Sequence, residues 1–232
     1  KETNGAFDIT IGCLLELWGF ENFSSRVLFK VPSYKEILDR LKLVGYNKII
    51  LDKNESSVFL KYKGMKINLG GIAKGYALKL AKDKLLNYGF KDFLINLGGD
   101  IYTYRTKKET PWKVAVQHPR KKDRFLTVLE LDTISCATSG DYERFFIKEG
   151  QRYHHILDPK TGYPKGNVIS VTVMCEDPAL ADALATAIFV LGEVEGIEVA
   201  KRFKADCIII KEEHNNLKIF TTDALKNIKF EL

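Results

Sequence analysis

The sequence predicts an α+β fold, in which mixed and largely antiparallel sheets pack against helices. Strand-like apolar segments follow one another in runs, without the strict strand–helix alternation that builds a doubly wound parallel sheet. Helical periodicity is confined to a few segments with recognisable start and stop signals. The chain has 232 residues, of which 45% are hydrophobic and 28% are charged, so its composition is that of a globular protein. We expect one functional body over residues 1–232, although this length also suits two small domains.

Three helices are expected in the first half of the chain. Residues 10–20 are apolar and begin in helical fashion. Ser33 and Glu36 have the spacing of a capping box, which opens an amphipathic helix that Gly45 stops. Apolar side chains recur at helical spacing over residues 72–88. Short apolar segments predict strands at residues 48–52, 57–62, 65–69 and 93–97.

The second half is dominated by strands. In the middle of it, Asp177 is suited to be an N-cap and Pro178 to be the first residue of a helix that runs to Gly192. A further helix is expected at residues 195–203. Strand-like segments lie at residues 112–116, 126–131, 132–139, 145–147, 168–175, 207–211 and 217–221.

Charge and cysteine usage exclude several classes of protein. The net charge of +6 is spread along the chain, with no basic stripe and no nucleic-acid-binding module, so we expect a lysine-rich solvated surface and no nucleic-acid partner. No apolar run approaches the ~20 residues that span a bilayer, so no transmembrane segment is expected. The four cysteines lack the spacing of metal ligands, and their apolar surroundings predict buried free thiols: Cys13, Cys136, Cys175 and Cys207.

The pentapeptide Ile-Asn-Leu-Gly-Gly occurs twice, at residues 67–71 and 95–99. Each copy is expected to end an apolar strand, and the first leads directly into a helix. Paired glycines there allow close approach of a ligand, and a helix N-terminus presents free N–H groups to phosphate. The alternative is that both pairs form tight turns with positive φ. Neither copy matches the known phosphate-binding loops.

Asp182 and Thr186 are the only polar residues in the apolar segment 179–191. They lie four residues apart, so they project from one face of the predicted helix. A buried carboxylate needs a partner, and carboxylate and hydroxyl oxygens suit Mg²⁺. The alternative is structural: Asp182 in the first helical turn, favoured by the helix dipole, and Thr186 bonded to the carbonyl four residues earlier.

His154 and His155 are adjacent at the end of a strand-like segment and precede an Asp-Pro-Lys-Thr-Gly turn at residues 158–162. Neighbouring side chains of a strand point in opposite directions, so only one histidine can face a given site. A single histidine is more often a packed or surface residue than a catalyst. The segment Thr138-Ser139-Gly140-Asp141 superficially resembles a nucleophile turn, but it lacks the G-x-S-x-G pattern and no base can be assigned to it.

Taken together, the sequence resembles the ApbE family of FAD:protein FMN transferases. The matching stretches are GAFDITIG at 5–12, LWGF at 17–20, NLGGIAKGYA at 68–77, NLGGD at 96–100, ATSGDY at 137–142, HHILDP with TG at 154–162, and ADALATA at 181–187. The resemblance implies an ApbE-like α+β fold with the FAD and metal site between its layers. It also implies that a further segment precedes residue 5 in family members, with part of the FAD enclosure.

The resemblance implies a role for particular residues. Mg²⁺ would be bound by Asp182, by Thr186 and by the backbone carbonyl of Gly71. His155 is the candidate base, because histidine titrates near neutral pH. The implied FAD contacts are Ala6, Phe7, Asp8, Asn68, Lys74 and Ile156; Asn68 stands where the family commonly has Asp, which removes a charge.

The expected reaction is phosphoryl transfer. A Ser or Thr hydroxyl of an acceptor protein attacks the FMN-side phosphorus of FAD, and AMP leaves. Two alternatives remain open: an FAD pyrophosphatase that uses water instead, and a non-catalytic FAD-binding module. Many relatives are exported and lipid-anchored, so the resemblance implies a location at the cell envelope.

Overall fold

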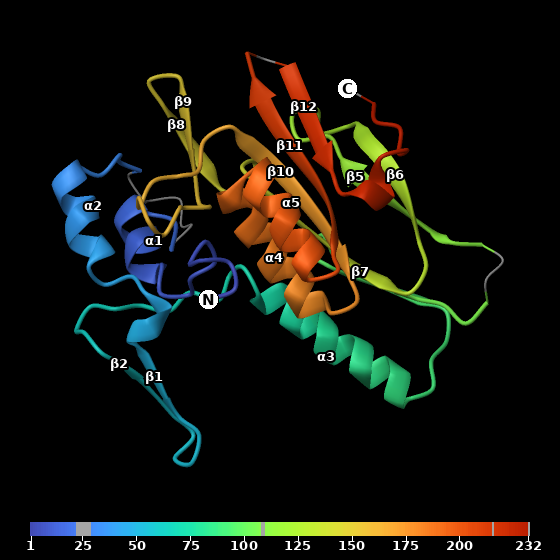
Figure 1. Ribbon diagram of the computed structural model, residues 1–232, viewed down its shortest axis with the longest axis horizontal. Helices are drawn as coiled ribbons and strands as arrows, with labels where there is room; N and C mark the ends of the chain where they lie inside the picture. The colour runs from blue at the N-terminus through green and yellow to red at the C-terminus, as the bar shows by residue number, and fades with distance from the viewer. Residues whose placement is uncertain (22–28, 108–109, 215, 232) are drawn as a thin grey trace. The chain divides into compact units, whose positions relative to one another are not determined.

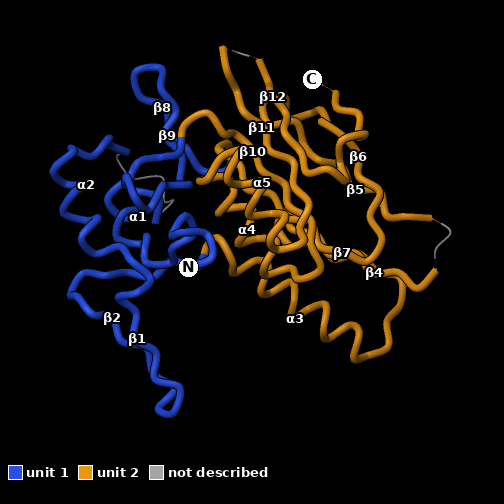
Figure 2. The backbone as a smooth tube through the Cα atoms, viewed as in Figure 1, with its two compact units in different colours: residues 1–69, 143–165 blue, residues 70–142, 166–232 orange. Residues whose placement is uncertain are grey.

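The computed structural model describes residues 1–21, 29–107, 110–214 and 216–231 (Figure 1). The chain forms two compact units, each assembled from two stretches of sequence (Figure 2). Unit 1 contains Lys1–Leu69 and Glu143–Lys165, and unit 2 contains Gly70–Tyr142 and Gly166–Leu232.

The described residues of unit 1 form two α-helices and two hairpins. Its elements are α1 (Gly12–Trp18), α2 (Tyr34–Leu41), a 3-10 turn (Tyr46–Lys48), β1 (Ile49–Asp52), β2 (Ser57–Leu60), β8 (Phe145–Lys148) and β9 (Gln151–His154). Strands β1 and β2 pair with each other, as do β8 and β9, and both pairs are antiparallel. The predicted capping box is confirmed, because Ser33 accepts from the backbone of Glu36 while the Glu36 carboxylate accepts from the Ser33 backbone. Helix α2 ends at Leu41, before the predicted stop at Gly45.

The strand predicted at residues 65–69 is wrong. This segment makes a single isolated bridge, between Lys66 and Ile11, and the backbone N–H of Asn68 donates to the Ile9 carbonyl at 2.7 Å. Its neighbour is the irregular chain that enters α1, which offers no extended edge along which a ladder could continue. The first Ile-Asn-Leu-Gly-Gly copy therefore does not end a strand.

The core of unit 1 forms around Trp18. Its indole is fully buried and lies 5.5 Å from the ring of Tyr153 and 5.8 Å from the ring of Tyr163, measured between centroids. Its Nε1–H donates to the backbone carbonyl of Gly162 at 2.8 Å. Trp18 thus ties α1 to the turn at residues 158–162, which the Asp-Pro-Lys-Thr-Gly sequence correctly predicts.

Substituting Trp18 with Phe should lower the free energy of unfolding by about 2–4 kcal/mol, since it leaves a buried carbonyl without its donor and opens a cavity. The matched control is Trp112→Phe, because Trp112 is only partly buried and its bond to the Tyr104 carbonyl is longer, at 3.3 Å. Urea unfolding of both variants checks this. Equal losses of unfolding free energy in the two variants would show that the hydrogen bond from Trp18 to the Gly162 carbonyl does not add to stability.

Unit 2 is built on a six-stranded antiparallel sheet of order β12-β11-β10-β7-β4-β3. The strands are β3 (Phe93–Leu97), β4 (Asp100–Tyr104), β7 (Ile134–Gly140), β10 (Val168–Cys175), β11 (Asp206–Glu213) and β12 (Asn216–Thr221), and the separate hairpin is β5 (Trp112–Gln117) with β6 (Phe125–Leu131). The helices are α3 (Ala73–Asn87), α4 (Pro178–Leu191) and α5 (Glu193–Arg202), and a 3-10 turn (Asp223–Leu225) follows β12. The predicted α+β class with antiparallel sheets is confirmed.

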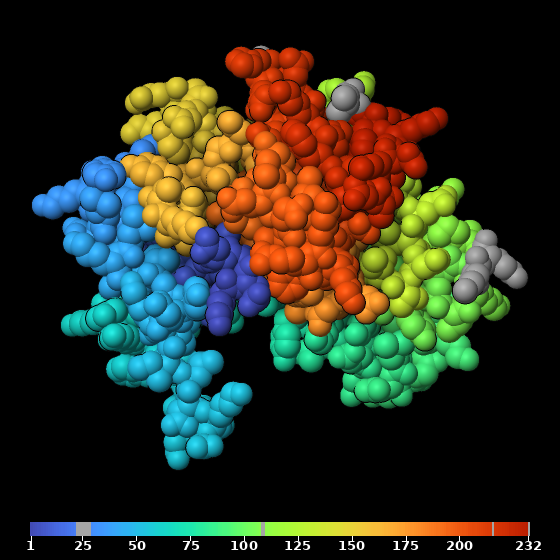
Figure 3. Space-filling model, viewed as in Figure 1, coloured from blue at the N-terminus to red at the C-terminus, as the bar shows by residue number. Residues whose placement is uncertain are grey.

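The sheet of unit 2 is covered on both faces. Helix α4 packs on β10 and β7, and α3 and α5 flank it on the same face (Figure 1). In the space-filling view, α4 and α5 lie beside β11 and β12 on the visible face of the unit (Figure 3). On the other face, side chains of β5 and β6 form an apolar cluster with Ile208 and Ile210 of β11. This two-sided cover explains why every residue of β10 is buried.

The second Ile-Asn-Leu-Gly-Gly copy forms the turn of a β3–β4 hairpin. Gly98 and Gly99 have φ of 60° and 95°, which side chains disfavour, and the Gly99 N–H donates to Asn96 Oδ1 at 3.0 Å. The positive-φ interpretation therefore holds for this copy. In the first copy, Gly70 and Gly71 do not have positive φ and lead into α3. Strand β4 was not predicted, because it follows the turn without a sequence signal of its own.

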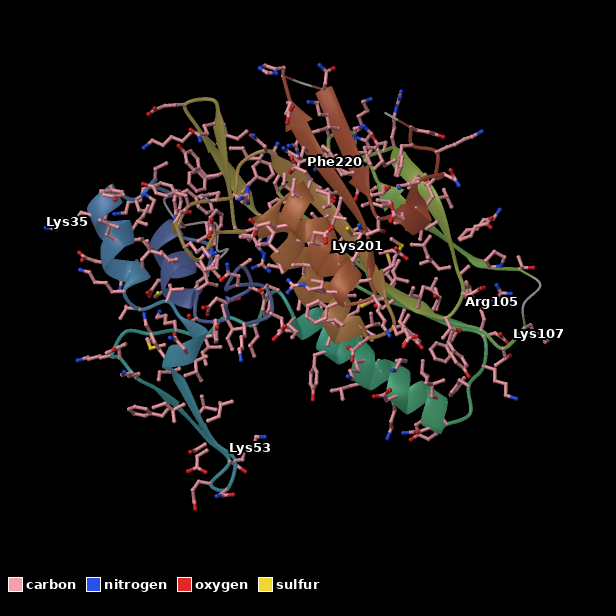
Figure 4. All side chains as sticks on the ribbon, viewed as in Figure 1. Lys35, Lys53, Arg105, Lys107, Lys201 and Phe220 are labelled. Atoms are coloured by element: carbon pink, nitrogen blue, oxygen red, sulfur yellow. The ribbon has the colours of Figure 1, made fainter. Side chains whose placement is uncertain are left out.

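The exposed lysines and the buried cysteines are as the sequence predicts. Exposed lysines project from different elements, such as Lys35 on α2, Lys53 in the β1–β2 turn and Lys201 on α5 (Figure 4). All four cysteines are buried and free. Among the described residues, none of the helices combines the length and the apolar character needed to cross a bilayer.

Candidate functional site

The crossing of α3 and α4 in unit 2 is close because Gly75 lies at it. A Cβ added to Gly75 would stand 2.3 Å from the Pro178 carbonyl oxygen and 2.7 Å from the Cβ of Asp182. No side chain fits there, so glycine lets the first turn of α3 approach the backbone of α4. An ion pair between Lys79 of α3 and Asp177, the N-cap of α4, supports the same crossing.

Asp182 is buried at this crossing and binds the N-terminus of α3. Its Oδ2 accepts from the Gly75 N–H at 2.9 Å, and its residue is 4% exposed. Ile72, the N-cap of α3, makes no side-chain cap, so a carboxylate from another helix takes that place. Burial nevertheless raises the pKa of the Asp182 carboxyl, against the lowering effect of the Gly75 hydrogen bond. The first-turn interpretation of Asp182 is wrong, because α4 begins at Pro178.

Thr186 lies one turn further along α4, on the face predicted from its spacing to Asp182. Its Oγ1 lies 3.2 Å from Oγ of Ser139 in β7, and either hydroxyl can be the donor. Thr186 is half-buried. If Ser139 accepts this hydrogen bond, the Thr186 oxygen presents its lone pairs to another group.

A second carboxylate, Asp100, is buried at the start of β4. It is 1% exposed; Lys74 Nζ lies 3.1 Å from its Oδ1, and its Oδ2 has no hydrogen-bond partner among the described residues. Burial, followed by the charge of Asp182, raises the pKa of Asp100 to about 6. Asp100 in turn adds to the effect of burial, which raises the pKa of the Cys136 thiol to about 12. Two carboxylates and one lysine are thus gathered at the start of α3.

These residues fit a hard divalent cation. The donors are carboxylate and hydroxyl oxygens, the set preferred by Mg²⁺, and one buried carboxylate oxygen, Oδ2 of Asp100, accepts no hydrogen bond from the residues that the structure describes. No cluster of three or more His, Cys, Asp or Glu side chains suited to a metal occurs in the described part of the chain. A cation here would therefore draw on hydroxyl and backbone oxygens too, and Gly71 lies two residues before the first residue of α3.

The raised pKa of Asp100 has a consequence for stability. A carboxyl whose pKa is about 6 in the folded state and 3.8 otherwise binds its proton more tightly when folded, so it stabilises below pH 3.8 and this stability is lost as pH rises through 6. Between pH 4 and pH 7, the unfolding free energy of the metal-free protein should fall by up to about 3 kcal/mol relative to Asp100→Asn. Urea unfolding of both proteins across this range measures it. A pH-independent difference would contradict the raised pKa.

The predicted residues of unit 1 have mainly local partners. Asp8 is buried, and its Oδ1 accepts from the backbone and hydroxyl of Thr10 while its Oδ2 accepts from the Tyr46 N–H at 2.8 Å. Asp8 therefore organises the loop that enters α1. Ala6 is buried and Phe7 half-buried in the same loop. This leaves their predicted contact with FAD a prediction.

The two histidines differ in exposure. His154 is buried, and its Nε2 lies 2.8 Å from the Lys165 carbonyl. His155 is half-buried, with Nδ1 3.2 Å from the carbonyl of Arg144. A carbonyl can only accept, so Nδ1 of His155 carries the proton and Nε2 is the ring atom able to accept one. Ile156 is buried beside them, with its N–H 3.3 Å from Nδ1 of His154.

Sequence reasoning missed two residues of the unit 2 site as individual functional groups. Asp100 and Ser139 each lie within a matching stretch, yet neither was singled out. The structure brings Asp100 near Lys74 and Asp182, and Ser139 near Thr186. A carboxylate that directly follows a glycine turn and precedes an apolar strand was the available signal for Asp100.

Comparison with known proteins places the chain in a family. It matches the model of the ApbE family over residues 1–209. The FAD:protein FMN transferases of Haemophilus influenzae and Klebsiella pneumoniae are 32% and 36% identical, over 98% and 91% of this chain and 67% and 65% of their own lengths. The chain thus spans about two thirds of these relatives.

Solved structures of similar fold belong to the same family. The ApbE protein of Thermotoga maritima has a TM-score of 0.86 and 40% identity, covering 99% of this chain and 74% of that one. The apo form of the flavinyl transferase ApbE from Pseudomonas stutzeri has a TM-score of 0.83 and 30% identity, covering 98% and 70%. Sequence motifs, fold and both comparisons lead to one conclusion: the chain belongs to the ApbE family.

Proposed function

We propose that this protein transfers FMN from FAD to a Ser or Thr hydroxyl of an acceptor protein, releasing AMP, in a Mg²⁺-dependent reaction. The observation that carries the proposal is the buried oxygen-donor site of unit 2, where Asp182 and Thr186 share one face of α4. Relatives named FAD:protein FMN transferase support the choice of substrate. A module that only stores FAD has no need of such a site.

In this reaction a bond forms between the acceptor oxygen and the FMN-side phosphorus. The bond from that phosphorus to the bridging oxygen breaks, and AMP leaves with the electron pair. Asp182, Thr186 and the Gly71 carbonyl would hold Mg²⁺, which supplies neutralisation of the negative charge on the pyrophosphate oxygens. Lys74, in the first turn of α3, carries a positive charge that can bind a phosphate oxygen.

His155 is the proposed base. Its Nδ1–H donates to the Arg144 carbonyl, which fixes the tautomer in which Nε2 accepts the hydroxyl proton. His155→Gln should lower the rate of transfer by about 100-fold. The measurement is the pH–rate profile of both proteins. The wild-type rate should fall at acidic pH as the base is protonated, and this fall should be absent in the variant. A variant with an unchanged rate and profile would remove His155 from the mechanism.

The proposed function is tested by incubating the protein with FAD, Mg²⁺ and a flavin-acceptor domain, and measuring the intact mass of the acceptor. We expect a gain equal to the FMN group, lost when the target Ser or Thr is replaced by Ala. Free FMN and AMP without a labelled acceptor would identify a pyrophosphatase instead. FAD binding with no turnover, unaffected by Asp182→Ala, would identify a non-catalytic FAD-binding module.

A further inference from the structure

The charges gathered at the start of α3 do not balance. Asp100 and Asp182 are both buried, at 1% and 4% exposure, and the charge of Asp182 is close enough to raise the pKa of Asp100. The cationic side chain that bonds Asp100 is Lys74, whose own side chain is 42% exposed. Two ionised carboxylates and one lysine leave one negative charge in a buried setting, which is costly unless a cation compensates it.

One carboxylate oxygen of Asp100 indicates where a compensating cation would bind. Lys74 binds Oδ1 of Asp100, and the other oxygen, Oδ2, is buried and has no hydrogen-bond partner in the part of the chain that the structure describes. The Cys136 thiol and the Asp182 carboxylate lie near Asp100, and the backbone N–H of Thr138 acts on the Asp100 carboxylate as a hydrogen-bond donor that lowers its pKa. Thr138 places its own hydroxyl 2.9 Å from that of Thr172. Since a buried acceptor without a donor is rare in native proteins, Oδ2 calls for an explanation.

We propose that Asp100 is an additional carboxylate of the divalent-cation site, with Oδ2 directed at the cation held by Asp182 and Thr186, in direct contact or through one of its waters. This inference rests on the proposed function, because it assumes the cation at Asp182. Lys74 then has a second role: it holds Oδ1 and competes with the cation for the charge of Asp100 in the absence of FAD.

A purely structural role for Asp100 makes the opposite prediction for Lys74. If the carboxylate serves only to anchor α3 through Lys74, removing the lysine weakens the site or leaves it unchanged. If Asp100 binds the cation, removing the competing lysine strengthens cation binding, because both carboxylates then depend on the added ion for their neutralisation. The sign of the Lys74 effect therefore separates the two roles.

The experiment is a titration of the whole metal-free protein with Mn²⁺ at pH 8 without FAD, followed by electron paramagnetic resonance of the free ion. We expect Asp100→Asn to weaken Mn²⁺ binding by about 10–100-fold. Lys74→Met should tighten it several-fold. The matched control is Asp177→Asn, which removes one carboxylate from the N-cap of the same helix as Asp182 and keeps a capping side chain; its affinity should stay within about twofold of the wild type.

The outcomes separate the inference from the proposed function. Loss of affinity in both Asp182→Asn and Asp100→Asn supports the inference. Loss in Asp182→Asn alone overturns the inference and leaves the proposed function standing. No Mn²⁺ binding by the wild type, or binding that neither variant reduces, overturns both. If circular dichroism shows that Asp100→Asn is unfolded, Lys74→Met decides: tighter binding supports the inference, and unchanged or weaker binding overturns it.

Discussion

Replacing Asp182 with Asn is expected to lower the rate of FMN transfer by about 1,000-fold or more, because the variant loses the charged ligand of the proposed Mg²⁺ site. The substitution is chosen to spare the fold. The amide oxygen of Asn can still accept from the Gly75 N–H, so the cap on α3 remains. Rates are measured by mass spectrometry of the acceptor at saturating FAD and Mg²⁺.

Asp177→Asn is the control for Asp182→Asn. It removes the same charge from the same helix, where Asp177 pairs with Lys79 and caps α4. We expect this control to transfer FMN within about threefold of the wild-type rate. An Asp182→Asn variant that retains a tenth or more of the wild-type rate would contradict the assignment of the metal site, because the removed ligand would then be dispensable.

The largest effect on stability is expected from Gly75→Ala. The added methyl would stand 2.3 Å from the Pro178 carbonyl oxygen and 2.9 Å from the Cα of Ala179, and these backbone atoms cannot rotate away. Helices α3 and α4 must therefore separate, with a loss of about 3 kcal/mol or more in the free energy of unfolding. The same movement pulls Asp182 from the N-terminus of α3, so cation binding should weaken as well.

The matched control is Gly166→Ala, also in unit 2. Apart from its two chain neighbours, no atom of the described residues would lie within 4 Å of its added methyl, and its φ is not positive. This variant should stay within about 0.5 kcal/mol of the wild type in urea unfolding. If Gly75→Ala were equally mild, the close crossing of α3 and α4 would not be needed to place Asp182.

The fold could be predicted where its signals are local. The capping box at Ser33 and the Asp177-Pro178 helix start depend on neighbours within three residues, and both were found from the sequence. Residues 65–69 were assigned wrongly because strand-like residues form a strand only where an edge is available to pair with. Strand β4 was missed for the converse reason, since it is specified by its hairpin partner β3.

In the site, too, local features could be predicted from the sequence and long-range contacts could not. The spacing of Asp182 and Thr186 predicted their shared face, because four residues make about one helical turn. Their partners could not be predicted: Gly75 is 107 residues from Asp182, and Ser139 is 47 residues from Thr186. The importance of Asp100 depends on its burial and on Lys74 and Asp182, which are distant from it in the sequence, so no local pattern records it.

In the proposed reaction, Asp182 and Thr186 hold the cation that binds the FAD pyrophosphate. A crystal structure of the protein with FAD and Mn²⁺, in which the anomalous signal of manganese locates the ion, tests this assignment. We expect one ion about 2.0–2.3 Å from oxygens of Asp182 and Thr186, with pyrophosphate oxygens completing its shell. An ion or a pyrophosphate bound elsewhere, with these two side chains uninvolved, would contradict the account.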